Sequence, residues 1–443
     1  MAMRGRFLAI AAAGLALCVA GPAEARKKPP PVPVPAAPVI PQVKTGDSAV
    51  DAFYYYDRAG APVWLASEAG RQAATKIAEI LKRAPIDGLA EGPALAATVE
   101  AAIVGGTLSD DAAISLAWMK YIRALKAPLS GVEYGDGTLV VKPPTVQQAL
   151  SAALAAPSLV SHVTEVAAVN PFYSTLRDAA LAGNSAADPH VRGTLDRLRL
   201  VPAKGKLIIV DTANQRLMMV EDGIVAGSMK VVIGKVKSPT PLIAGMVHFV
   251  TLNPYWNIPS DVVQRRIAPI VVKRGVSYLK AARYQSTDKW GATAAVIDPA
   301  TIDWKAVAKG EAPAYLRQLP GMNNMMGKMK FGFANRFDVF LHDTPHKELF
   351  AKAKRNLSMG CVRLEHAPDL ARWLLGSDAA PSGDAPEQQI ALPAGIPVYT
   401  VSLTANVDSG QIVYADDVYG FDRPEQAQAV AASAAPVAED GLR

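Results

Sequence analysis

The sequence has few of the residues that mark several common classes of protein. Only two of its 443 residues are cysteines, which excludes a disulfide-rich scaffold and a zinc module built mainly on cysteine. The 46 Lys and Arg exceed the 40 Asp and Glu by six, without the concentrated basic patch that nucleic-acid binding needs. The sequence has no P-loop and no G-x-G-x-x-G after a strand. Half of the residues are hydrophobic and 19% are charged, so the chain can fold around a core and wholesale disorder is excluded. We expect no nucleic-acid partner, because the basic patch is missing.

The amino terminus, residues 1–25, has the pattern of an export signal. Arg4 and Arg6 precede an apolar run of about 14 residues, shorter than the ~20 that a membrane-spanning helix needs. An A-x-A site ends at Ala25, where we expect cleavage. The alternatives to a cleaved signal peptide are a retained membrane anchor and a lipoprotein with lipid-modified Cys18. Because no other apolar stretch of about 18 residues follows, we expect no transmembrane anchor in the mature chain.

Composition divides the remaining chain into segments of different character. Residues 26–46 form a proline-rich linker, and residues 47–200 have the Ala/Leu-rich pattern of a helical domain. Strand patterns follow over 204–423, interrupted at 253–330 by a long segment that we expect to act as a cap. Residues 424–443 are rich in Ala, Glu and Pro and are predicted to be disordered. The predicted fold class is therefore α+β, with a helical domain followed by a mostly-β domain.

Local patterns predict individual elements within these segments. We expect helices over 71–84, from Ser109 onward, and over 145–155, 171–182 and 368–375. We expect strands over 207–210, 216–221, 225–233, 247–252, 338–341, 361–364, 396–403 and 411–414, with Asp222-Gly223 as a hairpin turn and 377–391 as a polar loop.

The reactive chemistry of the chain centres on one thiol and one imidazole. Once the export signal is removed, Cys361 is the only cysteine that remains. A thiol has a pKa of about 8.5, so catalysis needs a partner such as His342 that stabilises the thiolate as an ion pair and later protonates a leaving amine. Gly360 allows a tight turn, and we expect its N–H and that of Cys361 to face a developing oxyanion. A buried inert thiol and a structural histidine are the alternatives that these residues leave open.

A metal site is the competing interpretation of the same segment. His342 and His346 are four residues apart, with Asp343 and His366 nearby. Pro345 lies between the two histidines and is poorly tolerated inside a helix, so the pair is not expected to share one helical face. We therefore expect neither a metal nor a cofactor.

The segment HDTP, followed by SMGCVR, resembles the L,D-transpeptidases with a YkuD-type catalytic domain. Further stretches resemble the same family and its large periplasmic members with a helical scaffold domain: Ile208-Ile209-Val210 with Arg216-Leu217, Thr240-Pro241, Leu316-Arg317-Gln318, Phe53-Tyr54, and Asp416 to Gly420. The resemblance covers residues 50–423. Met359 departs from the pattern, since many relatives have His or Ser there, and the chain has no room for the peptidoglycan-binding insert of some large members.

The resemblance implies a role for each residue of the motif. Cys361 is the nucleophile and His342 the base and then the acid, while the carbonyl of Asp343 orients the imidazole and Gly360 supports the oxyanion. Substrate contacts are implied for Arg363, Ser358, Phe340, Thr344 and, in the cap, Tyr255, Trp256 and Asn257.

The implied reaction is acyl transfer on peptidoglycan stem peptides in the periplasm. Cys361 would attack the bond between the diamino acid and D-Ala of a tetrapeptide, release D-Ala and pass the thioester to an amine, forming a 3–3 crosslink. Carbapenem-type inhibitors would acylate the same cysteine. The alternatives are an L,D-carboxypeptidase, a lipoprotein-anchoring transferase with the same thioester, and a non-catalytic wall-binding module.

Overall fold

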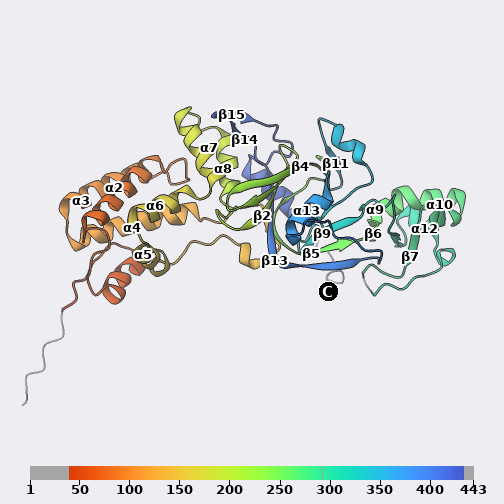
Figure 1. Ribbon diagram of the computed structural model, residues 1–443, viewed down its shortest axis with the longest axis horizontal. Helices are drawn as coiled ribbons and strands as arrows, with labels where there is room; N and C mark the ends of the chain where they lie inside the picture. Colours follow the sequence, from red (N-terminus) through yellow and green to blue (C-terminus); the bar gives the residue numbers. More distant parts are fainter. Residues whose placement is uncertain (1–38, 292, 434–443) are drawn as a thin grey trace, which may run out of the picture. The chain divides into compact units, whose positions relative to one another are not determined.

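The computed structural model describes residues 39–291 and 293–433, coloured along the chain in Figure 1. The predicted signal peptide, its cleavage site at Ala25 and most of the proline-rich linker lie outside the described residues, as do residues 434–443. Within the described ranges, no helix is both long enough and apolar enough to cross a membrane. A helical region precedes a mostly-β region, which confirms the predicted α+β class.

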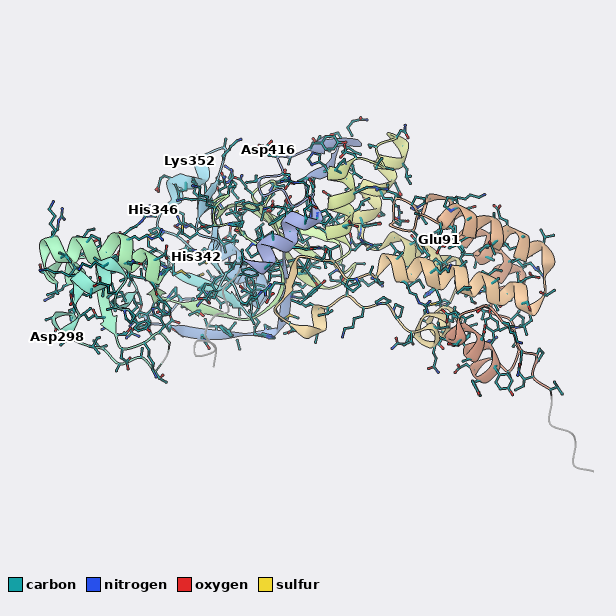
Figure 2. The ribbon with its side chains drawn as sticks, turned by 180° about the vertical axis from the view of Figure 1, so that it is seen from behind. Glu91, Asp298, His342, His346, Lys352 and Asp416 are labelled. Atoms are coloured by element: carbon teal, nitrogen blue, oxygen red, sulfur yellow. The ribbon has the colours of Figure 1, made fainter. Side chains whose placement is uncertain are left out.

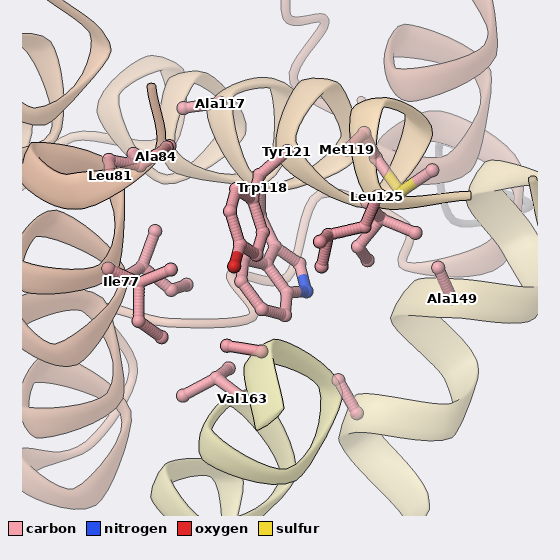
Figure 3. Packing of buried hydrophobic residues seen from close by; sticks show 14 of the residues in the cluster. Ile77, Leu81, Ala84, Ala117, Trp118, Met119, Tyr121, Leu125, Ala149 and Val163 are labelled. Carbon is pink, nitrogen blue, oxygen red and sulfur yellow. The ribbon is translucent and has the colours of Figure 1, made fainter. Parts of the chain in front are cut away.

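Helices fill the first part of the described chain. They are α1 (Ser48–Ala52), η1 (Phe53–Asp57), α2 (Glu68–Arg83), α3 (Gly92–Gly105), α4 (Leu108–Leu125), α5 (Val146–Ala155), α6 (Leu159–Ala168), α7 (Pro171–Ala182) and α8 (Pro189–Leu198), with the short η2 (Gly137–Leu139). Trp118 and Tyr121 of α4 stack with ring centroids 5.5 Å apart and lie between Ile77 of α2 and Val163 of α6 (Figure 3). These aromatic rings fill the centre of the helical region.

One segment of the helical region belongs to the sheet instead. β1 (Val132–Tyr134) runs parallel to β5 (Leu242–Leu252), and Val132 lies beside Leu242. The N–H of Gly135 extends this contact by donating to the carbonyl of Ala244 at 2.9 Å. We predicted no strand within the helical domain at residues 47–200. Three residues are too few for an alternating pattern to stand out in the sequence.

Ten strands form the main sheet, and the sheet closes on itself. Besides β1 and β5 it contains β2 (Lys206–Asp211), β3 (Arg216–Glu221), β4 (Ile224–Gly234), β9 (Met329–Phe333), β10 (Leu341–His342), β11 (Asn356–Ser358), β12 (Val362–Leu364) and β13 (Gln388–Val401). The order is β5-β13-β2-β3-β4-β12-β10-β9, and β9 also pairs with β5. A closed sheet encloses its own core and protects its strand edges.

Alternating side chains of β2 belong to two different cores. Ile208 and Val210 pack inside the closed sheet, while Leu207 and Ile209 pack with the helical region. This follows from strand geometry, because successive side chains point to opposite faces. The helical region and the sheet therefore share one hydrophobic cluster, in agreement with a single compact unit from Pro41 onward.

A buried arginine also connects the helical region to the last part of the chain. Nε of Arg197, on α8, donates to the carbonyl of Ser402, and Nη1 donates to the carbonyl of Phe421 at 2.9 Å. Nη2 forms an ion pair with Asp422. All three guanidinium nitrogens thus have partners.

The segment predicted as a cap folds around a small core of its own (Figure 1, green). Its strands are β6 (Trp256–Asn257), β7 (Tyr284–Thr287) and β8 (Tyr315–Gln318), in the order β6-β8-β7; its helices are α9 (Ser260–Val262), η3 (Val263–Ile267), α10 (Ala268–Arg274), α11 (Ser277–Ala281), η4 (Pro299–Thr301) and α12 (Trp304–Lys309). Ile258, Trp304 and Leu316 are buried in this core. The main sheet resumes with β9, so Met329 and Lys330 at the end of the predicted cap belong to that sheet.

Several predicted elements have different limits in the structure. The strand predicted over 338–341 is reduced to β10, because Asp338 has a φ of 57° and the chain turns there. β13 begins within the predicted loop 377–391. The predicted disordered tail begins with a helix, α14 (Pro424–Ala432), which buries Ala427 and Val430. The remaining elements are η5 (Lys347–Ala351), α13 (Ala367–Leu375) and the hairpin of β14 (Ala405–Asp408) and β15 (Gln411–Tyr414).

Candidate active site

The thiol and the imidazole lie on neighbouring strands of the closed sheet. β10 runs parallel to β12, with His342 beside Arg363. Cys361 directly precedes β12, and the N–H of Val362 donates to the carbonyl of Phe340 at 2.9 Å. Continuing this register places Cys361 beside Phe340. Cys361 and His342 therefore share one face of the sheet as diagonal neighbours.

The turn before the thiol needs a glycine, and hydrogen bonds from distant segments hold it in place. Gly360 has a φ of 122°, a region that residues with a Cβ rarely adopt. The hydroxyl of Thr240 donates to the carbonyl of Gly360 at 2.7 Å and accepts the N–H of Gly234 at 3.0 Å. Tyr419 in turn donates to the carbonyl of Gly234 at 2.6 Å. Sequence reasoning missed Thr240 and Tyr419 as site residues, although both lie in stretches that resemble the family.

The side chain of Ser358 stabilises the same turn through two hydrogen bonds. Its buried hydroxyl donates to the carbonyl of Cys361 at 2.6 Å and accepts the N–H of Gly360 at 3.2 Å. Short hydroxyl side chains often satisfy a backbone N–H two residues ahead. The N–H of Gly360 is therefore engaged, which corrects its expected role as an oxyanion donor. Within the described residues, the N–H of Cys361 has no acceptor, so this donor is available to a substrate.

His342 is buried and held in one tautomer. Its Nδ1 lies 2.5 Å from the backbone carbonyl of Asp343. Because a carbonyl oxygen can only accept, Nδ1 carries the proton and Nε2 keeps its lone pair. Burial lowers the pKa of His342 to about 4, and the positive charges of Arg363 and Lys330 add to this effect. The imidazole is consequently neutral near pH 7, with Nε2 unprotonated.

The resting thiol is also neutral. Burial raises the pKa of Cys361, and Asp338 adds to this effect, whereas the backbone of Phe340 and the cations Lys330 and Arg363 partly oppose it. Sγ lies 3.6 Å from the carbonyl of Asp338, to which the thiol donates. Among residues 39–291 and 293–433, no hydrogen bond joins this thiol to the imidazole. The two pKa shifts thus oppose the resting ion pair expected from the sequence.

The loop after β10 is fixed by the Asp343 side chain. Its carboxylate pairs with Nζ of Lys347 at 2.7 Å and accepts the N–H of Lys328 at 2.9 Å. Thr344 is buried, and its hydroxyl accepts the N–H of His346 at 3.2 Å. His346 itself is exposed, while His342 lies among the strands (Figure 2). These contacts hold the carbonyl that orients the imidazole.

Two cations flank the imidazole, and the sequence singled out only one of them. Lys330 of β9 lies directly beside His342 on the side opposite Arg363. Nζ of Lys330 is 3.9 Å from the ring centroid of Phe340. In the sequence, Lys330-Phe331 resembles only the family's approach to the catalytic strand, and the strand register is what brings Lys330 to the site.

The predicted cap residues lie in a different neighbourhood. Trp256 and Asn257 form β6, which pairs with β8. The ring of Tyr255 lies 4.2 Å from the guanidinium carbon of Arg317, and its N–H donates to the carboxylate of Glu387. The contacts found for these residues in the described chain are with the cap segment and the loop before β13, so their substrate role stays a prediction.

The alternative interpretation as a metal site finds no support in the described ranges, which contain no group of three or more His, Cys, Asp or Glu side chains arranged to hold an ion. A cysteine nucleophile needs a base within reach, and here the thiol and the imidazole share one face of neighbouring strands.

Comparison with known families agrees with this interpretation. The family model of the L,D-transpeptidase catalytic domain (YkuD) matches residues 205–399, and the model of the Scaffold domain matches residues 49–179. A putative L,D-transpeptidase of Haemophilus influenzae is 27% identical over 386 residues, covering 83% of this chain and 77% of its own. Residues 205–399 therefore match an L,D-transpeptidase (YkuD) catalytic domain, and residues 49–179 match a Scaffold domain. The predicted limits 47–200 and 204–423 stay predictions.

Two solved structures match a smaller share of this chain than the curated relative does. The carbamoyl enzyme that Ldtfm forms with avibactam is 15% identical with a TM-score of 0.22, covering 46% of this chain and 51% of its own. An L,D-transpeptidase from Mycobacterium smegmatis is 14% identical with a TM-score of 0.23, covering 45% and 59%. The chain thus spans little more than half of each of these proteins.

Proposed function

We propose that this protein is a peptidoglycan L,D-transpeptidase in which Cys361 is the nucleophile and His342 the general base and acid. One observation carries the proposal: the carbonyl of Asp343 binds Nδ1 of His342 and leaves Nε2 free on the face that bears the thiol. The match of residues 205–399 to the family's catalytic domain supplies the reaction class.

The first half-reaction forms a thioester. Nε2 of His342 takes the thiol proton while Sγ of Cys361 attacks the carbonyl carbon between the diamino acid and D-Ala. The developing oxyanion accepts the N–H of Cys361. The imidazolium then gives its proton to the D-Ala nitrogen, so the C–N bond breaks and D-Ala leaves as a neutral amine.

The second half-reaction passes the acyl group to an acceptor. An amine of a neighbouring stem attacks the thioester, and His342 accepts the proton that this amine loses. The C–S bond breaks, and the sulfur leaves as a thiolate that the imidazolium reprotonates. A 3–3 crosslink results. Because burial keeps both groups neutral at rest, charge develops only when substrate is bound.

We expect the residues around the thiol to contact the substrate. Arg363 and Phe340 flank the reacting pair, and Ser358 shapes its turn. We assign Thr344 to the loop that borders this face. Tyr255, Trp256 and Asn257 would hold the stem peptide if the cap segment closes over it.

Location and inhibition follow from the same proposal. Cleavage near Ala25 would release the mature protein into the periplasm, where stem peptides are exposed. One solved relative forms a carbamoyl enzyme with avibactam. We therefore expect carbapenem-type inhibitors to acylate Cys361.

Product analysis with purified donor and acceptor stems tests the proposal. The wild-type protein should yield crosslinked stems and free D-Ala in the mass spectrum, and Cys361→Ala should yield neither. Tripeptide without crosslinks would assign an L,D-carboxypeptidase, and transfer to a lysine peptide would assign an anchoring transferase. No D-Ala release by the wild type, with an intact fold, would leave only a wall-binding module.

A further inference from the structure

A row of three side chains crosses neighbouring strands beside the thiol. In β9, β10 and β12, Lys330 lies beside His342, and His342 lies beside Arg363. The residues next to them in sequence point into the enclosed core: Met329, Phe331, Leu341, Val362 and Leu364. Side chains alternate along strands, so the row occupies the opposite face, with about 4.8 Å between strands.

Within the part of the chain that the structure describes, both cations of this row lack a carboxylate partner. Across residues 39–291 and 293–433, neither Lys330 nor Arg363 takes part in an ion pair. Nε of Arg363 is buried without a hydrogen-bond acceptor. A buried donor without an acceptor costs free energy, which a ligand with acceptor oxygens would recover.

The carboxylates of the neighbourhood are engaged elsewhere or too far away. Asp343 pairs with Lys347 at 2.7 Å, and Glu348 lies 3.1 Å from a histidine ring nitrogen. Asp338 is close enough for Lys330 to lower its pKa against the larger, opposite effect of burial, yet it forms no ion pair. A carboxylate from outside the chain is therefore the partner that fits the row.

The covalent structure of the donor brings such a carboxylate to this place. In the proposed reaction the nitrogen of the leaving D-Ala must approach His342 to receive a proton. The carboxylate of that D-Ala is only two bonds from this nitrogen. It must therefore come next to the neighbours of the imidazole in the row, which are Lys330 and Arg363.

We propose that Lys330 and Arg363 form a carboxylate-binding pair for the terminal D-amino acid of the donor stem. The assignment rests on the proposed function and adds Lys330 as a binding residue and the free carboxylate as the group recognised. The pair would select stems that end one residue after the scissile bond, because a longer stem has a peptide bond instead of a carboxylate at this position.

Steady-state acylation of the full chain by two donors tests the pair. The donors are a tetrapeptide ending in D-Ala and the same peptide ending in D-alaninamide, which removes only the charge. For the wild type we expect a KM about 10- to 100-fold higher with the amide, the range of a charge-assisted hydrogen bond. Lys330→Met should raise the KM of the acid donor by a similar factor and that of the amide little, and Lys330→Arg should restore most of the loss.

Lys352→Met removes one exposed positive charge away from the row and serves as the matched control (Figure 2). Equal KM values for both donors in the wild type would overturn the proposal without any substitution, whether or not Lys330→Met folds. An equal rise for both donors in Lys330→Met would also overturn it. If the wild type is acylated by neither donor, the proposed function itself fails.

Discussion

Two arginines near the closed sheet have opposite surroundings. Arg197 is buried and bonded through all three guanidinium nitrogens, to two carbonyls and to Asp422. Arg363 is partly buried, and its Nε has no acceptor in the described chain. Fold stability explains the first arrangement, since its groups satisfy one another. The second arrangement is explained if a ligand supplies the hydrogen-bond acceptor that the described chain does not provide.

The comparison extends to the acids and histidines around each arginine. Asp422 also accepts from His190 Nδ1 at 2.6 Å and from the hydroxyl of Thr404 at 3.0 Å, so this network is complete. Around Arg363, the thiol and the imidazole are neutral and not bonded to each other. The uncommitted polar groups around Arg363 therefore distinguish its surroundings from the complete network around Arg197.

The largest expected effect is on the reaction. His342→Gln should lower the rate of Cys361 acylation by about 10²- to 10⁴-fold, the usual contribution of a general base. His346→Gln removes an exposed imidazole four residues away and is the matched control. The rates are obtained by quenching the acylation reaction at set times and measuring the acylated fraction by intact-mass analysis. Equal rates in His342→Gln and wild type would remove His342 from the mechanism.

The two arginines should differ in their effect on stability. Arg197→Met removes the guanidinium from buried Asp422, whose remaining partners are His190 and Thr404, and should lower the free energy of unfolding by about 3–5 kcal/mol. Arg363→Met breaks no ion pair within the chain and should change it by less than about 1 kcal/mol. Denaturant unfolding measures both. A loss in Arg363→Met as large as in Arg197→Met would show that the contrast between them is wrong.

The pH dependence of stability tests the burial of the imidazole. The pKa of His342 falls from its ordinary value of 6.5 to about 4 on folding, so the unfolded chain binds more protons between these values. Stability should therefore decrease as the pH falls through this window, by about 3 kcal/mol from this group. Burial raises the pKa of Asp211 to about 6, which affects stability over an overlapping pH range. Comparing wild type with His342→Gln separates the contribution of His342 from that of Asp211. Parallel stability curves for the two proteins would contradict the lowered pKa.

The smallest expected effect is on the turn that carries the thiol. Thr240→Val removes the hydroxyl that binds Gly360 and should cost about 1 kcal/mol of stability. Thr240→Ser keeps the hydroxyl and should restore most of the loss in both stability and acylation rate. No change in Thr240→Val would mean that the turn holds its shape through Ser358 alone.

Sequence patterns predicted the long, regular elements well. The helix over 171–182 and the strand over 216–221 have the expected limits, since their apolar spacing is clear. β1 and the short β10 were missed or misplaced, because pairing with distant strands decides them. Element limits depend on tertiary contacts that a local pattern does not contain.

The residues of the candidate site also fall into those that the sequence predicted and those that it did not. Cys361, His342 and Gly360 stand out through residue type and motif, and the carbonyl of Asp343 lies against Nδ1 of His342. Lys330 and Thr240 reach the site only through strand register and a distant turn. The neutral state of the thiol and imidazole depends on burial, which the sequence of the motif does not specify.

The most direct test is intact-mass analysis of the full chain mixed with a tetrapeptide donor. We predict an adduct equal to the donor without D-Ala, on Cys361, in the wild type and not in Cys361→Ala. An unmodified wild-type protein, or the same adduct in Cys361→Ala, would contradict the account.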